Sequence, residues 1–472
     1  MTNTLNIYID ISSLLSWTGP ATGMIRVESE LYHHVKQHLP NATPCFYDIA
    51  TNTYRSIADS WLEPLAGPQT KLAPPLTPRT GWVRFMPNRS RVLLAIERIR
   101  LKASNPILAD VMDKLQRMLL AIRKHHFPLE DCNGVRISLV PRDMAIGKSI
   151  RLGENDLVLS ASSDWSRKDP AALAELKQQQ KFLLVVICYD IIPFLFPQFF
   201  LAQDVESFRI YWEQMFHSAD LLIVNAKCTK NDIENYCQSR NLALTNIAVA
   251  ALGCDLTKAH GDNAYPLRPE LLAEHYVLFV STIEPRKNHR LLLSVWRALI
   301  ADGLIGRTGF KLVFVGRRGW MNEDVQGQLD QNLFSGSVLH LEHVDDAELS
   351  SLYANAAFCV YPSLYEGFGL PVVEAFAQGK AVICSTGGSL GELFEGVMPC
   401  IAAHDESAWR QQIASWIAYP NQPKEAVSRM ASCFQAKTWP EAMSNLIALS
   451  LASVKSPTTA KRENNCANLD RA

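Results

Sequence analysis

The chain has 472 residues, of which 48% are hydrophobic and 20% are charged, and its formal net charge is -1. This length and apolar content are too great for a disordered protein or for one small domain, and they predict two domains that each bury a core. The balance of 46 basic against 47 acidic residues excludes charge-driven binding along nucleic acid, so any charged ligand must be bound locally.

The first predicted element is a β-strand over residues 5–11, which a glycine-containing turn connects to a helix over residues 24–38. This order of elements is typical of the start of a parallel α/β sheet. Strand patterns at residues 183–188 and 221–225 alternate with helical segments. We therefore expect one α/β domain over residues 1–255.

Residues 67–150 are predicted to be an insertion in this first domain. Proline is frequent at residues 67–78, which indicates a loop, and residues 89–126 have a mostly helical pattern in which Lys and Arg outnumber Asp and Glu. Two interpretations of the basic segment stay open. It is either a face for an acceptor or an anionic membrane surface, or a solvated helical hairpin.

The second half of the chain repeats the alternation of strands and helices. The strands are expected at residues 276–280, 311–315, 337–341, 358–361 and 381–384. A polar, proline-containing stretch at residues 257–275 precedes them and marks the domain boundary. We predict a second domain over residues 256–435, a helix over residues 436–452 that crosses back to the first domain, and a disordered tail over residues 453–472.

The spacing of the cysteines and the hydropathy of the chain indicate where the protein is located in the cell and whether it binds a metal. The eleven cysteines are scattered without CxxC pairs or His-rich spacing, which favours buried, reduced thiols in a cytoplasmic protein and no metal site. The N-terminus lacks a basic region before an apolar core, and Asp190 interrupts the most apolar run, residues 182–196. We therefore expect neither a signal peptide nor a membrane span.

The most informative segment begins with the strand that ends near Tyr361. It continues as Leu-Tyr-Glu-Gly-Phe-Gly-Leu-Pro, and a helix follows through Ala377. Gly367 and Gly369 allow backbone amides to approach a ligand closely, and the helix N-terminus favours an anion such as a diphosphate. Because carboxylates accept hydrogen bonds from paired hydroxyls, Glu366 and Glu374 suit a sugar and a ribose, although Glu374 also suits the helix dipole.

The segment from Glu366 to Glu374 resembles the Glu-x7-Glu signature of retaining glycosyltransferase family 4. Residues 280–288, with the sequence Val-Ser-Thr-Ile-Glu-Pro-Arg-Lys-Asn, are similar to the strand-to-helix loop of that family, and residues 314–316 to its next strand end. The resemblance covers roughly residues 276–395. It implies an α/β, GT-B fold with two doubly wound Rossmann-like domains facing across a cleft, a nucleotide-sugar co-substrate, and no metal or other cofactor.

The same resemblance implies roles for individual residues. Lys287 and Arg286 hold the donor diphosphate, and Arg286 compensates for Thr282, which stands where many relatives have arginine. Glu366 contacts the transferred sugar, and Glu374 binds ribose. The further donor-binding residues that it implies are Gly23, Gly316, His343, Val344, Gly367, Phe368, Gly369 and Leu370. For His343, an ordinary loop before the next helix is an alternative.

The first half resembles a bacterial polysaccharide-assembly branch of the family through residues 22–27 and 188–193. Asp190 is expected to orient the acceptor hydroxyl, because Tyr189 replaces the histidine that relatives often have there. Arg26 and Trp165 are assigned to the acceptor side. A salt bridge within the helix is the alternative for Arg26, and a place in the core is the alternative for Trp165.

These features together predict a retaining hexosyltransferase that acts in lipopolysaccharide or O-antigen assembly. The expected donor is GDP-mannose or a UDP-hexose, and the expected acceptor is a saccharide or a lipid-linked saccharide. The enzyme is expected in the cytoplasm, with peripheral contact to the inner membrane as an open extension. A non-catalytic nucleotide-sugar-binding scaffold and a GT-B-like sugar phosphorylase are the alternatives.

Overall fold

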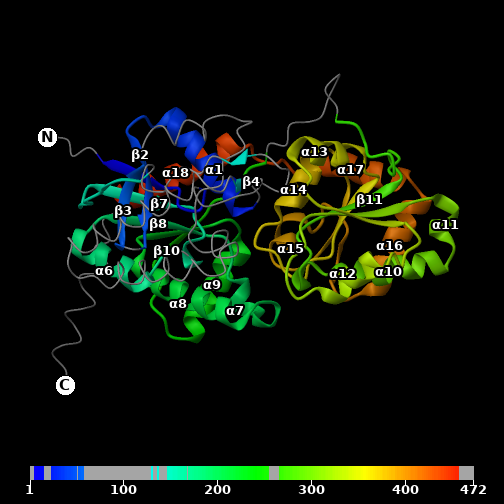
Figure 1. Cartoon of the computed structure of the whole chain (residues 1–472), viewed down its shortest axis with the longest axis horizontal. Helices are drawn as coiled ribbons and strands as arrows, with labels where there is room; N and C mark the ends of the chain where they lie inside the picture. Colours follow the sequence, from blue (N-terminus) through cyan, green and yellow to red (C-terminus); the bar gives the residue numbers. More distant parts are fainter. Residues whose placement is uncertain are drawn as a thin grey trace. The chain divides into compact units, whose positions relative to one another are not determined.

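The structure is a computed structural model that describes residues 5–14, 23–49, 51–57, 129–130, 136–137, 146–166, 168–254 and 265–455. The predicted proline-rich loop at 67–78 and the basic helical segment at 89–126 lie outside these ranges, as does the end of the predicted tail. Figure 1 shows the helices and strands in chain order.

Eight strands form the first sheet, in the order β10-β9-β8-β7-β1-β2-β3-β6. Their bounds are β1 (Asn6–Asp10), β2 (Ala42–Asp48), β3 (Thr53–Ile57), β6 (Ile146–Ser149), β7 (Asp156–Ser160), β8 (Leu183–Cys188), β9 (Leu221–Val224) and β10 (Asn246–Val249). Strand β1 runs parallel to β2 and β7, whereas β2 and β3 pair antiparallel. A separate pair joins β4 (Leu129–Glu130) to β5 (Arg136–Ile137).

The helices among these strands are α1 (Met24–His38), α6 (Pro170–Gln180), α7 (Ile192–Leu195), α8 (Ala202–Ser218) and α9 (Lys227–Ser239). Local chemistry fixes their ends. Asp169 caps α6, because its carboxylate accepts hydrogen bonds from the first amides of the helix, and Pro170 occupies the first turn. Strand β8 is almost wholly buried and apolar, as expected for a strand covered on both faces of a parallel sheet.

Six parallel strands form the second sheet, in the order β13-β12-β11-β14-β15-β16. Their bounds are β11 (Tyr276–Val280), β12 (Lys311–Val315), β13 (Val338–Leu341), β14 (Phe358–Tyr361), β15 (Val382–Ser385) and β16 (Cys400–Ile401). The core strands β11, β12 and β14 are composed mainly of buried Val, Leu and Phe.

Nine helices follow in the second half of the described chain: α10 (His289–Ala301), α11 (Leu304–Thr308), α12 (Glu323–Asp330), α13 (Asp346–Asn355), α14 (Leu370–Ala377), α15 (Ser389–Phe394), α16 (Glu406–Ala418), α17 (Asn421–Cys433) and α18 (Trp439–Lys455). Figure 1 shows α10, α12 and α16 on one side of the strands, with α13, α14 and α17 on the other. The sheet is therefore doubly wound, as predicted.

The chain divides into two compact units, residues 1–185 and residues 186–472. The division falls within β8, so the second unit holds the six-stranded sheet together with β9 and β10. The predicted boundary at residues 255–256 stays a prediction. None of the helices in the described ranges has the length and apolar content needed to span a membrane.

The last helix, α18, contacts β9 within the second unit. The backbone at Gly253 lies very close to the start of α18. A Cβ at this position would lie 2.6 Å from the Cα of Trp439, so only glycine fits there. The amide of Cys254 also donates to the carbonyl of Lys437 at 2.9 Å. The helix ends at Lys455, so the first three residues of the predicted disordered tail, 453–455, are helical.

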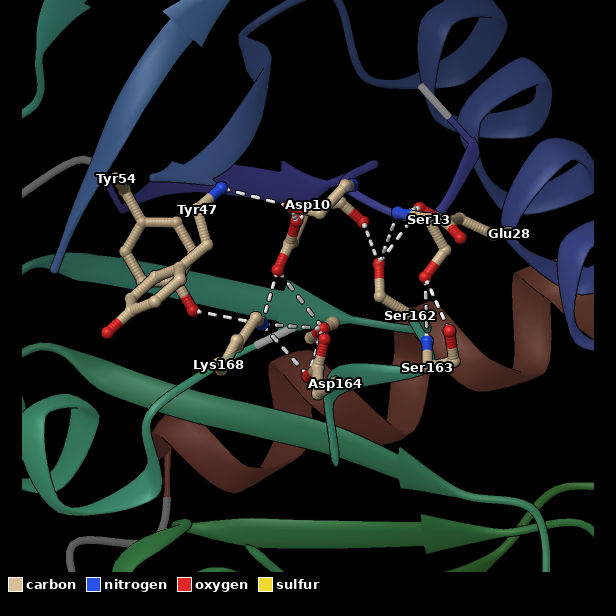
Figure 2. A network of polar contacts seen from close by, with 11 residues as sticks. Asp10, Ser13, Glu28, Tyr47, Tyr54, Ser162, Ser163, Asp164 and Lys168 are labelled. Carbon is tan, nitrogen blue, oxygen red and sulfur yellow. Dashed lines mark hydrogen bonds and ion pairs between the residues drawn. The ribbon is translucent and has the colours of Figure 1, made fainter. Parts of the chain in front are cut away.

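A buried ion cluster lies where β1 and β7 end side by side (Figure 2). Asp10 and Ser160 are opposite each other in the register of these strands. The Lys168 ammonium contacts the Asp10 carboxylate, lies 2.9 Å from the Asp164 carboxylate and donates to Ser160 at 3.2 Å. All three charged side chains are at most 1% exposed. The cluster thus carries two acidic groups and one basic group away from water.

Glu28, on α1, adds a third buried carboxyl group beside this cluster (Figure 2). Its Oε1 accepts from the amide of Ser13 at 3.1 Å and from the hydroxyl of Ser162 at 2.8 Å, whereas its buried Oε2 has no partner. Burial and then the charge of Asp10 raise the pKa of Glu28 to about 8. The group is therefore protonated at neutral pH.

The raised pKa of Glu28 predicts a specific dependence of stability on pH. Between about pH 4.5 and pH 8 the folded chain binds a proton that the unfolded chain lacks, so the free energy of unfolding falls as the pH rises through this window. The variant Glu28→Gln cannot ionise. Its free energy of unfolding should therefore not decline in this window. At pH 9 that free energy should exceed the value of the native chain by on the order of a few kcal/mol, since one pKa unit corresponds to about 1.4 kcal/mol.

Urea unfolding at pH 5, 7 and 9 measures this effect for the native chain and for Glu28→Gln. The exposed Glu175 on α6 provides a matched control, because Glu175→Gln removes a carboxyl group that remains in water. Parallel pH profiles for the native chain and Glu28→Gln would contradict the assignment of the proton to Glu28.

Candidate functional site

The second sheet has a topological switch point between β11 and β14. From β11 the chain continues outward through β12 and β13, and it then returns to β14 and continues in the opposite direction through β15 and β16. In open α/β sheets, ligands bind at the carboxyl ends of the strands beside such a point. Two predicted segments begin there, residues 281–288 after β11 and residues 362–369 after β14.

The segment after β11 presents Arg286 and Lys287 on a single 3-10 turn, η5 (Pro285–Lys287). Asn288 ends this turn in the left-handed region, with φ 61°, which asparagine tolerates better than most residues. Its side-chain amide donates to the carbonyls of Pro362 at 3.2 Å and Ala403 at 2.8 Å. Asn288 thereby fixes the basic turn against the segment that follows β14.

The segment after β14 presents Glu366 immediately before the glycines. Its carbonyl accepts hydrogen bonds from the amide of Ser389 at 3.0 Å and from the Ser389 hydroxyl at 3.1 Å. Gly388 forms a bridge to the same residue, and a Cβ at this position would clash with the Glu366 carbonyl. The start of α15 therefore holds the backbone of Glu366 in place through hydrogen bonds.

The side chains of these two segments meet in one cluster. Glu366 accepts from Arg286 at 2.8 Å through one oxygen and from Lys287 at 2.5 Å through the other. Arg286 also donates to Glu284 at 2.7 Å and to the carbonyl of Tyr365 at 2.7 Å. Each side chain is at most 14% exposed, so the ion pairs are only weakly screened by solvent.

Electrostatics keep Glu366 ionised. Burial alone would raise its pKa, but Arg286 and Lys287 outweigh burial and lower the pKa to about 2. A carboxylate with so low a pKa is a poor proton carrier near neutral pH. The arrangement instead suits an acceptor of hydrogen bonds next to two cations, which is the chemistry that a sugar linked to a diphosphate requires.

Asp190, two residues beyond β8, lies against the same segment of the second unit. A Cβ on Gly367 would lie 2.6 Å from the carbonyl oxygen of Tyr189 and 2.8 Å from the Cβ of Asp190. Burial raises the pKa of Asp190, and Arg286 opposes this shift. The predicted residues Asp190, Arg286, Glu366 and Gly367 are thus neighbours in the structure.

This close approach predicts a strong effect for Gly367→Ala. The added methyl group must displace the backbone at Tyr189 or at Gly367, and overpacking of this kind costs about 1–3 kcal/mol. We expect weaker nucleotide-sugar binding, measured by calorimetry. The matched control is Gly327→Ala on α12, where a Cβ meets no atom within 4 Å and alanine suits a helix. Equal binding by both variants would contradict the prediction.

Four other residues of the second unit were predicted to bind the donor. Gly369, with φ 84°, immediately precedes α14, and Phe368 beside it is buried. Gly316 follows β12 with φ 148°, and a Cβ there would clash with the carbonyl of Ser281. Leu370 is the first residue of α14, which has no side-chain cap. Their roles toward a donor stay predictions.

The remaining predicted residues of the second unit are Glu374 and the predicted base-binding residues His343 and Val344. Glu374, inside α14, accepts a hydrogen bond from the Tyr353 hydroxyl at 3.3 Å. His343 is exposed with φ 60°, and Val344 beside it is half-buried. Asp345 caps α13 by accepting from the amide of Glu348 at 2.9 Å. This is the helix start that the alternative interpretation of His343 expects, and the assignment to a base stays untested.

Three predicted residues belong to the first unit. Gly23 precedes α1 with φ 53°, which a side chain would disfavour. Arg26 is a half-buried residue of α1, and Trp165 is half-buried within η3 (Asp164–Ser166). Their assignment to donor or acceptor remains a prediction.

Sequence reasoning missed several partners of the cluster. Glu284 lies in the quoted segment but was not singled out, although its carboxylate binds Arg286. Asn288 could have been found from its place between two basic residues and a helix, because asparagine is one of the few residues that adopts the left-handed conformation readily. The hydrogen bond from Tyr365 to Asp232, at 2.6 Å, joins residues 133 positions apart and leaves no local signal.

A family model described as Glycosyl transferases group 1 matches residues 269–431. O-antigen chain mannosyltransferase B of Escherichia coli is 30% identical over 213 residues, which cover 44% of this chain and 54% of that protein. The chain thus spans about half the length of this curated relative. The matched family segment contains Arg286, Lys287, Glu366 and Glu374.

Two solved structures are similar along almost the whole chain. Sucrose-phosphate synthase from Thermosynechococcus elongatus is 16% identical with a TM-score of 0.55, covering 95% of this chain and 98% of that one. Anabaena HepE in complex with UDP-glucose is 15% identical with a TM-score of 0.55, covering 95% and 100%. At such low sequence identity, the similarity shows only that the fold is shared. The predicted GT-B fold is confirmed. Residues 269–431 of this chain are thus similar in sequence to the group 1 glycosyl transferases.

Proposed function

We propose that this chain transfers a hexosyl group from a nucleoside diphosphate sugar to a saccharide acceptor during polysaccharide assembly. The observation that carries the proposal is the meeting of Arg286, Lys287 and Glu366 at the switch point of the sheet. The cations suit the diphosphate and the carboxylate suits the sugar hydroxyls. Mannose is favoured as the hexose because the E. coli relative is named as an O-antigen chain mannosyltransferase.

The ion pairs indicate how the donor is received. In the structure, both oxygens of Glu366 are bound by Arg286 and Lys287. A diphosphate that binds these cations competes with Glu366 and releases at least one carboxylate oxygen for the sugar. Positive charge beside the leaving phosphate then stabilises the charge that develops as the glycosidic bond to the nucleotide breaks.

The acceptor side of the proposal rests on Asp190. Its carboxyl group lies beside Gly367, and its raised pKa makes it a stronger hydrogen-bond acceptor than an ordinary aspartate. In the proposed reaction, Asp190 orients the acceptor hydroxyl, while the leaving phosphate accepts the hydroxyl proton. This front-side route retains the anomeric configuration and needs no nucleophile from the protein. We further propose that the acceptor is a lipid-linked saccharide at the inner membrane surface.

A donor panel tests this function. The purified chain is incubated with labelled GDP-mannose, UDP-glucose or UDP-galactose, with and without oligosaccharide and lipid-linked acceptors. We expect one labelled glycan whose anomeric configuration, read by NMR, is that of the donor. Donor binding without product across the panel would favour a scaffold. Sugar 1-phosphate formed only when inorganic phosphate is present would favour a phosphorylase.

Metal removal provides a further prediction. Because Arg286 and Lys287 supply positive charge next to Glu366, transfer should persist at nearly its full rate in excess EDTA. Initial rates before and after dialysis against EDTA measure this. A loss of rate that Mg²⁺ or Mn²⁺ restores would contradict the metal-independent mechanism.

A further inference from the structure

Two cysteine thiols face each other on the strands that support the candidate site. Cys384 on β15 and Cys400 on β16 are register partners, and their Sγ atoms are 3.4 Å apart. Both are free thiols. Cys384 is fully buried and Cys400 is half-buried, so only the second is open to a small reagent from solvent.

The backbone geometry permits a bond between these sulfurs. Neighbouring strands lie about 4.8 Å apart, and disulfides join Cα atoms that are about 4.4–6.8 Å apart. Strand β16 has only two residues and forms the edge of the sheet. It can therefore move toward β15 without breaking pairs on its other side.

The chemistry of the pair assigns different roles to the two thiols. The hydrogen bond from Cys384 lowers the pKa of Cys400, whereas the same contact together with burial raises the pKa of Cys384. Cys400 is thus the thiol that forms a thiolate more readily, and it is also the more accessible one. These are the properties of a thiol that reacts first with an oxidant.

We propose that Cys384 and Cys400 form a reversible disulfide that regulates donor binding. The Cys400 thiolate attacks hydrogen peroxide, which forms a sulfenic acid as the O–O bond breaks and hydroxide leaves. The Cys384 thiol then attacks that sulfur, which forms the S–S bond and releases water. A dithiol such as dithiothreitol reverses the reaction by thiol–disulfide exchange.

The connection to the donor site runs through the residues after Cys384. The Ser385 hydroxyl donates to the carbonyl of Ser363, and Ser389 donates twice to the carbonyl of Glu366. A new bond at Cys384 therefore acts on strand β15, which binds Ser363 directly and leads into the start of α15 that binds the backbone of Glu366. This regulatory step rests on the proposed function of Glu366, but formation of the disulfide does not.

Peptide mapping after hydrogen peroxide treatment tests the bond without reference to activity. We expect a cross-link between the peptides of Cys384 and Cys400, with the loss of two hydrogen atoms, and its disappearance after dithiothreitol. Cys359→Ser on the neighbouring strand β14 is the matched control and should leave the cross-link unchanged. Oxidation that stops at a sulfinic acid on Cys400, or cross-links elsewhere with this pair reduced, would overturn the proposal.

Calorimetry with UDP and GDP tests the regulatory step. Oxidation of the native chain should weaken binding of whichever nucleotide it prefers by roughly 5-fold or more, the low end of ordinary coupling between two sites. The same treatment should leave Cys400→Ser unaffected. A cross-link without any change in affinity would refute regulation, and absence of nucleotide binding by the reduced native chain would refute the proposed function instead.

Discussion

Replacing Glu366 by glutamine is expected to reduce hexosyl transfer by roughly 10²–10³-fold, the usual cost of removing one well-placed polar group from a transition state. Nucleotide affinity should be kept or rise, because the carboxylate no longer competes with the diphosphate for Arg286 and Lys287. The measurements are initial rates with saturating donor and calorimetry with the nucleotide alone.

Lys287→Ala is the complementary variant. It removes a cation and should weaken nucleotide binding as well as transfer, so the two variants separate a sugar contact from a phosphate contact. Arg290→Ala is the control, because Arg290 is exposed and pairs with Asp324 on the surface. Each variant also needs a urea unfolding curve. If a folded Glu366→Gln protein transferred the hexose at a near-native rate, the assignment of Glu366 to the site would be contradicted.

Replacing Lys168 by methionine is expected to lower the free energy of unfolding by roughly 3–5 kcal/mol, the usual cost of leaving a buried charge without its partner. Lys168 contacts Asp10 and Asp164, and all three side chains are at most 1% exposed. Methionine fills a similar volume, so the loss arises from charge rather than from a cavity. Urea unfolding at pH 7 provides the measurement.

The exposed pair of Lys181 and Glu154 supplies the matched control for this variant. Its side chains are 69% and 70% exposed, so Lys181→Met should change stability by less than about 1 kcal/mol. The double variant Asp10→Asn with Lys168→Met should recover part of the loss, because one unpaired carboxylate is gone. Additive losses in the double variant would show that the two groups are not coupled.

The elements with strong local patterns were predictable from the sequence. The helix at residues 24–38 and the strands at residues 183–188, 276–280 and 311–315 have the predicted bounds. Their hydrophobic periodicity and flanking residues are local properties of the chain. The antiparallel strands β3 and β6 were not predicted, because their short sequences become strands only by pairing with neighbours.

The candidate site was predicted in part. The sequence indicated Arg286, Lys287 and Glu366 by their loops, but it did not show that one carboxylate binds both cations. It also gave no reason to place Asp190 beside Gly367. These contacts join residues that are distant in the chain, and pairing of this kind depends on how strand ends are brought together.

The sequence by itself determined the α/β alternation, the glycine loop with Glu366, and the resemblance to glycosyltransferases, because each depends on residues close together in the chain. Only the tertiary structure decided which charges are neutralised. Lys168 meets Asp10 across 158 positions, and Arg286 meets Glu366 across 80. Coulomb energy and desolvation depend on distance and burial in space, so the protonation of Glu28 and the ionisation of Glu366 follow from the fold.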